Sequence, residues 1–143
     1  MKQSDDSALT WLALPARPES LGPFRDFVFA QAKTAALPEG ICARIDLVLE
    51  EVLLNIFHYA YKEDQNGQVA LGCGWVPMDG FLIRVKDQGR PFDPLERAPA
   101  DISLNIEDRE IGGLGILLAR EMSSAMTYQR HGDCNILDIV FQA

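Results

Sequence analysis

The side chains best suited to chemistry begin with Glu51 and Asn55, which stand four residues apart in the stretch 50–61. Apolar residues recur around them at helical spacing, which predicts an amphipathic helix; they are Ile41, Ile45, Val48, Leu49, Val52, Ile56 and Ala60. Residues four apart project from one face of a helix. The pair therefore offers a proton acceptor beside a neutral oxygen ligand for a hard cation. Taken alone, this spacing is more often a solvated helix face.

A second motif follows a predicted strand and runs from Asp87 to Pro94. Asp, Gly and Pro are ordinary residues for a turn that ends a strand. The functional interpretation is a seat for adenine, in which the Asp87 carboxylate accepts a hydrogen bond from the exocyclic amine. Gly89 would then let the backbone approach the base closely.

A third motif places Gly112, Gly113 and Gly115 at the start of a predicted helix. Glycines there can serve simply as a flexible joint. They also expose backbone N–H groups, which bind phosphate oxygens with help from the helix dipole. Each glycine motif is weak evidence alone, but the three motifs in this order are much more specific.

Hydrophobic periodicity supplies the elements that must position these residues. We predict strands at 9–14, 68–76, 81–87, 126–130 and 135–141, and helices at about 20–34, 38–62 and 116–124. Sequential hairpins indicate a mostly antiparallel mixed sheet, which three amphipathic helices would cover on one face. The expected fold class is α+β, a two-layer sandwich. Residues 1–7 are polar and expected to be flexible.

Composition excludes several classes of protein. The 143 residues suit a single domain, and a net charge of −8 disfavours direct binding to nucleic acid or to an anionic membrane. The three cysteines, Cys42, Cys73 and Cys134, show no metal-binding spacing. Without a signal-peptide pattern or a long apolar run, we expect a cytoplasmic protein.

Together the motifs resemble the N, G1 and G2 boxes of the histidine-kinase-like (GHKL) ATPases, over about residues 9–142. The ending Pro91-Phe92-Asp93 resembles the anti-sigma-factor serine/threonine kinase branch, the SpoIIAB and RsbW type. The resemblance implies a histidine-kinase-like ATPase fold and one ATP-binding kinase-like domain spanning residues 1–143. It also implies an ATP lid at 94–111.

The resemblance also implies roles for the motif residues. Asn55 would ligate Mg²⁺, and Glu51 would be the general base that activates a partner's serine hydroxyl. Asp87 and Gly89 would seat the adenine of ATP. The lid would hinge on its three glycines, Gly112, Gly113 and Gly115. The implied partners are an anti-sigma-factor antagonist as protein substrate, a sigma factor, and a second copy of the chain in a homodimer.

Two features depart from the family pattern. Tyr59 stands where the family often has His, and His58 lies one position earlier, which we interpret as a surface residue. The lid is acidic, so that Arg97 and Arg109 are its candidates for reaching a γ-phosphate. Neither arginine is favoured over the other.

The leading hypothesis is therefore an ATP-dependent serine/threonine kinase of an anti-sigma-factor antagonist. The alternative is a non-catalytic, ATP-gated module that switches partners, although Glu51 favours the enzyme. The catalytic half of a two-component histidine kinase is a weaker interpretation, because Pro91 departs from the Asp-x-Gly-x-Gly common there. A protein that binds no nucleotide is the remaining alternative, since short motifs can mislead.

Overall fold

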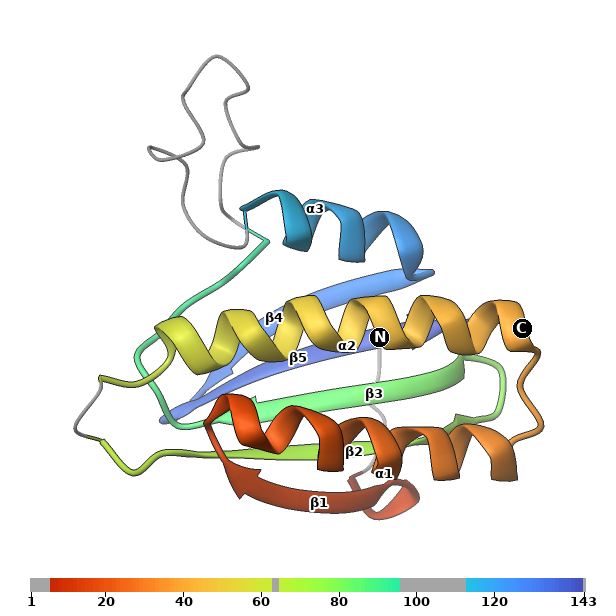
Figure 1. The fold of residues 1–143 in the computed structure, drawn as a ribbon, viewed down its shortest axis with the longest axis horizontal. Coiled ribbons are helices and arrows are strands. Elements are labelled where there is room, and N and C mark those ends of the chain that lie inside the picture. The colour runs from red at the N-terminus through yellow and green to blue at the C-terminus, as the bar shows by residue number, and fades with distance from the viewer. Residues whose placement is uncertain (1–5, 63–64, 96–112, 143) are drawn as a thin grey trace.

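A computed structural model describes residues 6–62, 65–95 and 113–142, with five strands in one layer and three helices in a second (Figure 1). The strands are β1 Thr10–Pro15, β2 Gln68–Val76, β3 Gly80–Asp87, β4 Ala125–His131 and β5 Cys134–Phe141. The helices are α1 Leu21–Thr34, α2 Glu39–Tyr59 and α3 Gly113–Met122, and two short 3-10 turns are η1 Asp6–Ala8 and η2 Pro18–Ser20.

The sheet has the order β1-β2-β3-β5-β4. Each of these neighbouring pairs is antiparallel, so the parallel component implied by a mixed sheet does not occur among the described strands. The helices lie side by side over one face, with α2 between α1 and α3 (Figure 1). The predicted α+β class and two-layer architecture are confirmed.

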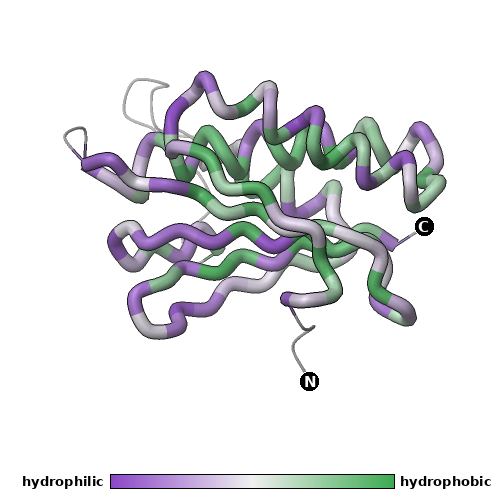
Figure 2. Tube along the Cα trace, turned by 90° about the horizontal axis from the view of Figure 1, so that it is seen from below, coloured by the Kyte–Doolittle hydropathy of each residue, from purple (hydrophilic) through white to green (hydrophobic). Residues whose placement is uncertain are grey.

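The core fills the space between the two layers. Phe81, Ile83 and Val85 alternate along β3 and pack against the buried stripe of α2, which includes Ile45 and Leu49. This arrangement follows from side-chain periods of two in a strand and 3.6 in a helix. Figure 2 shows the hydrophobic segments of helices and strands facing one another. No helix in the described part of the chain is long and apolar enough to cross a membrane.

Two predicted boundaries need correction. The third helix begins at Gly113 rather than Ile116, and it ends at Met122, because the Ser124 N–H bonds to the Val140 carbonyl at 2.8 Å. Residues 1–7 were expected to be flexible, yet Asp6 belongs to η1 and its carboxylate forms ion pairs with Arg84 and Lys86. Opposite charges on β3 therefore hold this part of the N-terminus against the sheet.

Candidate functional site

Residues of α2, β3, α3, β4 and β5, and of the loop after β3, line one pocket between α2 and the sheet. Asn55 and Ile56 come from α2, Asp87 ends β3, Phe92 lies in the loop after it, and Asn135 begins β5. The empty space of the pocket and its mouth is about 370 Å³, but only about 20 Å³ admits a water-sized sphere. The inner part thus has room for roughly one water molecule.

Asp87 is 6% exposed and sits at the closed end of this pocket. Its Oδ1 accepts hydrogen bonds from the Gly89 backbone N–H and from Asn135 Nδ2, both at 2.9 Å. Its Oδ2 has no hydrogen-bond partner among the described residues and remains available as an acceptor. Burial raises the pKa of Asp87, although the two hydrogen bonds and the charge of Arg130 oppose that rise.

Asn135 is a site residue that the sequence interpretation missed. It stands opposite Asp87 in the register of β3 and β5, and it is 4% exposed. Its Nδ2 also donates to the Arg90 carbonyl at 2.8 Å, while its Oδ1 accepts from the Phe92 N–H at 3.3 Å and from the Tyr128 hydroxyl. One side chain thus orients the carboxylate and fixes the loop that follows it.

The end of α2 holds the other side of that loop. A β-carbon at Gly89 would come within 2.2 Å of the Ala60 carbonyl oxygen, so only glycine fits there without displacing backbone. The Tyr61 hydroxyl donates to the Gln68 carbonyl at 2.7 Å and accepts from the Gln88 N–H at 2.8 Å. These contacts bring the predicted adenine loop onto the helix that carries Asn55.

Asn55 is 3% exposed, and its Oδ1 is buried without a hydrogen-bond partner. Among the described residues it is the only buried side-chain nitrogen or oxygen in that condition. An unpaired buried polar atom costs roughly 1–3 kcal/mol, and such an atom calls for a functional explanation. A cation that bonds to oxygen would supply the missing partner. The donor type at this position therefore fits Mg²⁺.

Glu51 lies one helical turn before Asn55 and is half-buried against α3. A β-carbon at Gly115 would come within 1.8 Å of Glu51 Oε2, so the glycine makes room for the carboxylate. Glu51 and Gly115 thus lie side by side. Gly113 begins α3, while Gly112 and the lid from residue 96, with Arg97 and Arg109, lie outside the described residues. Their roles remain predictions.

The departure at Tyr59 has a packing explanation. Its ring stacks on Phe92 with centroids 5.6 Å apart and an angle of 19° between the planes. Tyr59 therefore supports the loop that covers the pocket, while His58 is exposed, as expected.

Comparisons with known proteins agree with this geometry. The model of the family described as "Histidine kinase-like ATPase domain" matches residues 14–141. The chain is 26% identical over 129 residues to the serine-protein kinase RsbW of Bacillus subtilis (strain 168), covering 87% of this chain and 80% of that relative. It is 28% identical over 111 residues to RsbW of Listeria monocytogenes, covering 75% and 70%.

Two solved structures share the fold. The structure of the RsbU and RsbW domains of Rv1364c from Mycobacterium tuberculosis superposes with a TM-score of 0.63 at 12% identity, covering 93% of this chain and 32% of that one. The histidine kinase domain of the blue-light activated kinase EL346 from Erythrobacter litoralis gives 0.55 at 19% identity, covering 88% and 60%. The resemblance to the RsbW type is confirmed, and the chain belongs to the histidine kinase-like ATPase domain family.

Proposed function

We propose that this chain is an ATP- and Mg²⁺-dependent serine/threonine protein kinase that phosphorylates an anti-sigma-factor antagonist and also binds a sigma factor. The observation that carries the proposal is the unpartnered, buried Oδ1 of Asn55 in a pocket shared with Asp87. The similarity to relatives named serine-protein kinases supports the reaction type. The choice of antagonist and sigma factor rests on the resemblance to this kinase branch.

Each described residue has a distinct task in this proposal. Asp87 Oδ2 accepts a hydrogen bond from the exocyclic amine of adenine, while Asn135 keeps the carboxylate in orientation. Asn55 Oδ1 would hold Mg²⁺, and that ion would supply positive charge to neutralise the phosphates of ATP while the γ-phosphoryl group passes from ADP to the serine oxygen. Glu51 takes the proton that the serine hydroxyl loses. Gly115 has no β-carbon, which leaves room for the Glu51 carboxylate.

Replacing Glu51 tests the catalytic part of the proposal. Glu51→Gln keeps the side chain's size but removes its ability to accept a proton, so phosphoryl transfer should fall roughly 10²–10⁴-fold while ATP binding stays near normal. Glu50→Gln is the matched control, because Glu50 is exposed on the same helix. The assay follows labelled phosphate from ATP to a candidate antagonist protein. Asn55→Ala should weaken Mg²⁺-dependent nucleotide binding as well as the rate.

The outcomes separate the enzyme from the switch module. If Glu51→Gln phosphorylates the antagonist as fast as wild type, Glu51 is not the base. If wild type phosphorylates no partner and ATP instead changes which partner is held, the chain is a non-catalytic module.

A further inference from the structure

A second pocket lies on the other side of the adenine loop. It is lined by the end of α2, the loop residues Gln88–Pro91 and Arg130 of β4, and about 420 Å³ of it admits a water-sized sphere. Gly89 separates the two pockets: its N–H bonds to Asp87, and its carbonyl accepts from Arg130 Nη1 at 2.8 Å. We call this space the Arg90 pocket.

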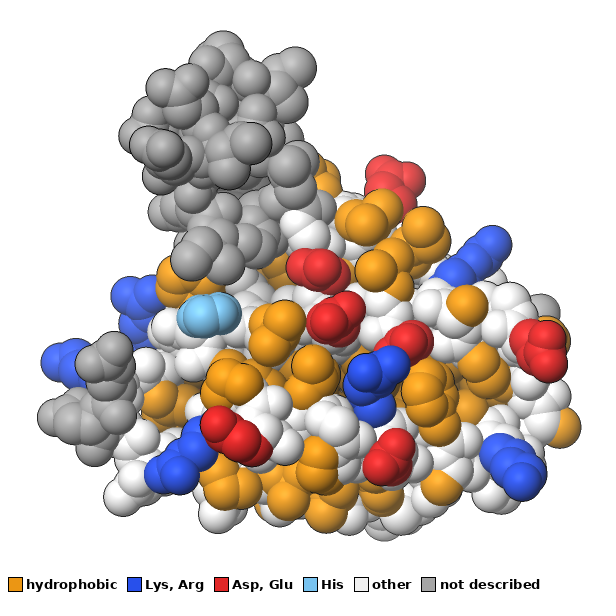
Figure 3. Space-filling model, in the orientation of Figure 1, with side chains coloured by type: hydrophobic (Ala, Val, Ile, Leu, Met, Phe, Trp, Pro, Cys, Tyr) orange, Lys and Arg blue, Asp and Glu red, His pale blue; other side chains and the backbone are white. Residues whose placement is uncertain are grey.

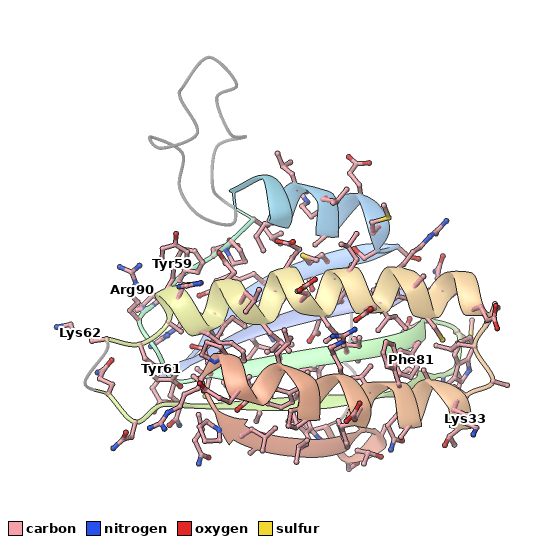
Figure 4. The ribbon with its side chains drawn as sticks, viewed as in Figure 1. Lys33, Tyr59, Tyr61, Lys62, Phe81 and Arg90 are labelled. Atoms are coloured by element: carbon pink, nitrogen blue, oxygen red, sulfur yellow. The ribbon has the colours of Figure 1, made fainter. Side chains whose placement is uncertain are left out.

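Three cationic side chains line the Arg90 pocket, namely Lys62, Arg90 and Arg130. None of the described residues that line it is Asp or Glu, and none of the three cations forms an ion pair with a described residue. Figure 4 shows Arg90 and Lys62 extending outward at the same end of the molecule, opposite the end that carries Lys33. In a chain of net charge −8, the described lining of this pocket thus carries three cations and no carboxylate.

Backbone contacts hold the two arginines in place. Arg90 Nε donates to the Tyr59 carbonyl at 2.8 Å, and Arg130 Nε donates to the Gly132 carbonyl at 3.2 Å. The Arg90 guanidinium also lies 5.8 Å from the centre of the Phe92 ring. Because each guanidinium has five N–H donors in a planar fork, donors remain for an external acceptor. A fixed fork binds a carboxylate in two-point fashion at a small entropic cost.

We propose that the Arg90 pocket binds an acidic segment of a protein partner. The overall negative charge repels long polyanions such as nucleic acid or an anionic membrane, whereas a short carboxylate-bearing segment meets mainly the local cations. That the partner is a protein rests on the proposed kinase function. The pocket anchors the partner and does not react with it, since Tyr59 lies roughly 12 Å along the helix from Glu51 at 1.5 Å per residue.

The test uses the full chain and two capped peptides, pentaglutamate and pentaglutamine, at equal and low ionic strength. Calorimetry measures affinity, and backbone amide NMR shifts locate the binding site. Pentaglutamate should bind and shift the amides of Gly89 and Arg90. The double variant Lys62→Gln/Arg90→Gln should weaken binding about tenfold, because it removes two exposed charge pairs with the peptide. Lys33→Gln, at the opposite end, should leave the affinity unchanged.

Two further variants keep the result interpretable. Lys62→Glu breaks no hydrogen bond to a described acceptor, because the Lys62 side chain makes none, and it should weaken peptide binding even if Arg90→Gln disturbs the loop. Asp87→Asn should lose nucleotide affinity but keep peptide affinity, so failure of this proposal differs from failure of the nucleotide site. Equal binding of both peptides, undiminished binding by the double variant and by Lys62→Glu, or equal loss in Lys33→Gln would overturn the proposal.

Discussion

Strands β3 and β5 carry two polar pairs, three residues apart and on opposite faces of the sheet. Arg84, Asp87 and Asn135 are buried, and Asp138 is 17% exposed. Arg84 faces Asp138, and Asp87 faces Asn135, each pair directly opposed in the same ladder. The first pair lies on the face without helices and the second on the face beneath α2. The two pairs show that a single ladder can place one carboxylate where it stabilises the fold and a second carboxylate where it can bind a ligand.

On the open face, four described charged side chains pair with one another: Asp6, Arg84, Lys86 and Asp138. Arg84 is 2% exposed and forms a two-point ion pair with Asp138 at 2.8 and 2.9 Å and a third contact with Asp6 at 2.7 Å. The Asp138 hydrogen bond is the main reason that the pKa of Arg84 is raised. Burial pushes the pKa of Asp6 upward, but hydrogen bonds from Lys86 and Arg84 outweigh that effect and lower it. The Lys86 ammonium also lies 5.1 Å from the Trp11 ring centre.

On the helix face, the Asp87 carboxylate accepts hydrogen bonds, among the described residues, only from a neutral amide and a backbone N–H. Burial raises its pKa, against these bonds and the charge of Arg130. Asn55 Oδ1, in the same pocket, has no partner at all among the described residues. Charged side chains of both signs lie on the surface over the helices (Figure 3). The pocket therefore holds two oxygen atoms without hydrogen-bond partners among the described residues, Asp87 Oδ2 and Asn55 Oδ1, whereas the charges around Arg84 are paired. This contrast indicates that the pocket binds a ligand.

The largest expected effect comes from breaking the compensated pair. Asp138→Asn leaves a buried guanidinium with Asp6 as its remaining carboxylate, and we expect the free energy of unfolding to fall by roughly 3 kcal/mol. Asp6→Asn is the control, and because Asp6 is 46% exposed its loss should cost no more than about 1 kcal/mol. Urea denaturation measures both. A smaller loss for Asp138→Asn than for Asp6→Asn would remove the structural role assigned to this pair.

Asp87→Asn should weaken nucleotide binding while changing the stability of the fold little. The amide oxygen can still accept from Gly89 and Asn135, and a desolvated charge disappears, so the free energy of unfolding should fall by less than it does in Asp138→Asn. The new N–H group would face the adenine amine in place of the acceptor Oδ2, and nucleotide binding should weaken by roughly 1.5–3 kcal/mol. Calorimetry with ATP and denaturation of the same sample give both numbers. Unchanged ATP affinity would refute the adenine role.

Gly89→Ala tests whether the loop geometry matters as much as its charge. The added methyl group would meet the Ala60 carbonyl oxygen at 2.2 Å, and relieving that overlap should cost about 1–3 kcal/mol of stability and weaken ATP binding. Gly40→Ala in α2 is the matched control, because nothing lies within 4 Å of its added carbon, and it should gain up to about 1 kcal/mol. Equal behaviour of the two variants would contradict the close packing of Gly89.

The sequence predicted most of the fold but only part of these two pairs. β2 was predicted within its observed bounds, Gln68–Val76, because alternation and flanking turns mark it clearly. Asp87 was identified by its motif, whereas Asn135, 48 residues away, becomes its partner only through the register of β3 and β5. The same register places Asp138 opposite Arg84, and the placement of η1 brings Asp6 to the same guanidinium. Periodicity predicts which face a residue occupies, and long-range pairing decides what it meets.

The most direct test of the central claim compares ATP with GTP. Adenine offers an amine to Asp87 Oδ2, whereas guanine presents a carbonyl oxygen at the equivalent ring position, which the carboxylate repels. With Mg²⁺ and ATP at a hundredfold excess over its dissociation constant, the free energy of unfolding should rise by about 2.7 kcal/mol, and ADP should also stabilise the protein. GTP at the same concentration should shift the melting temperature little. If neither ATP nor ADP shifts it at millimolar concentration, or if GTP matches ATP, the account of the Asp87 pocket is wrong.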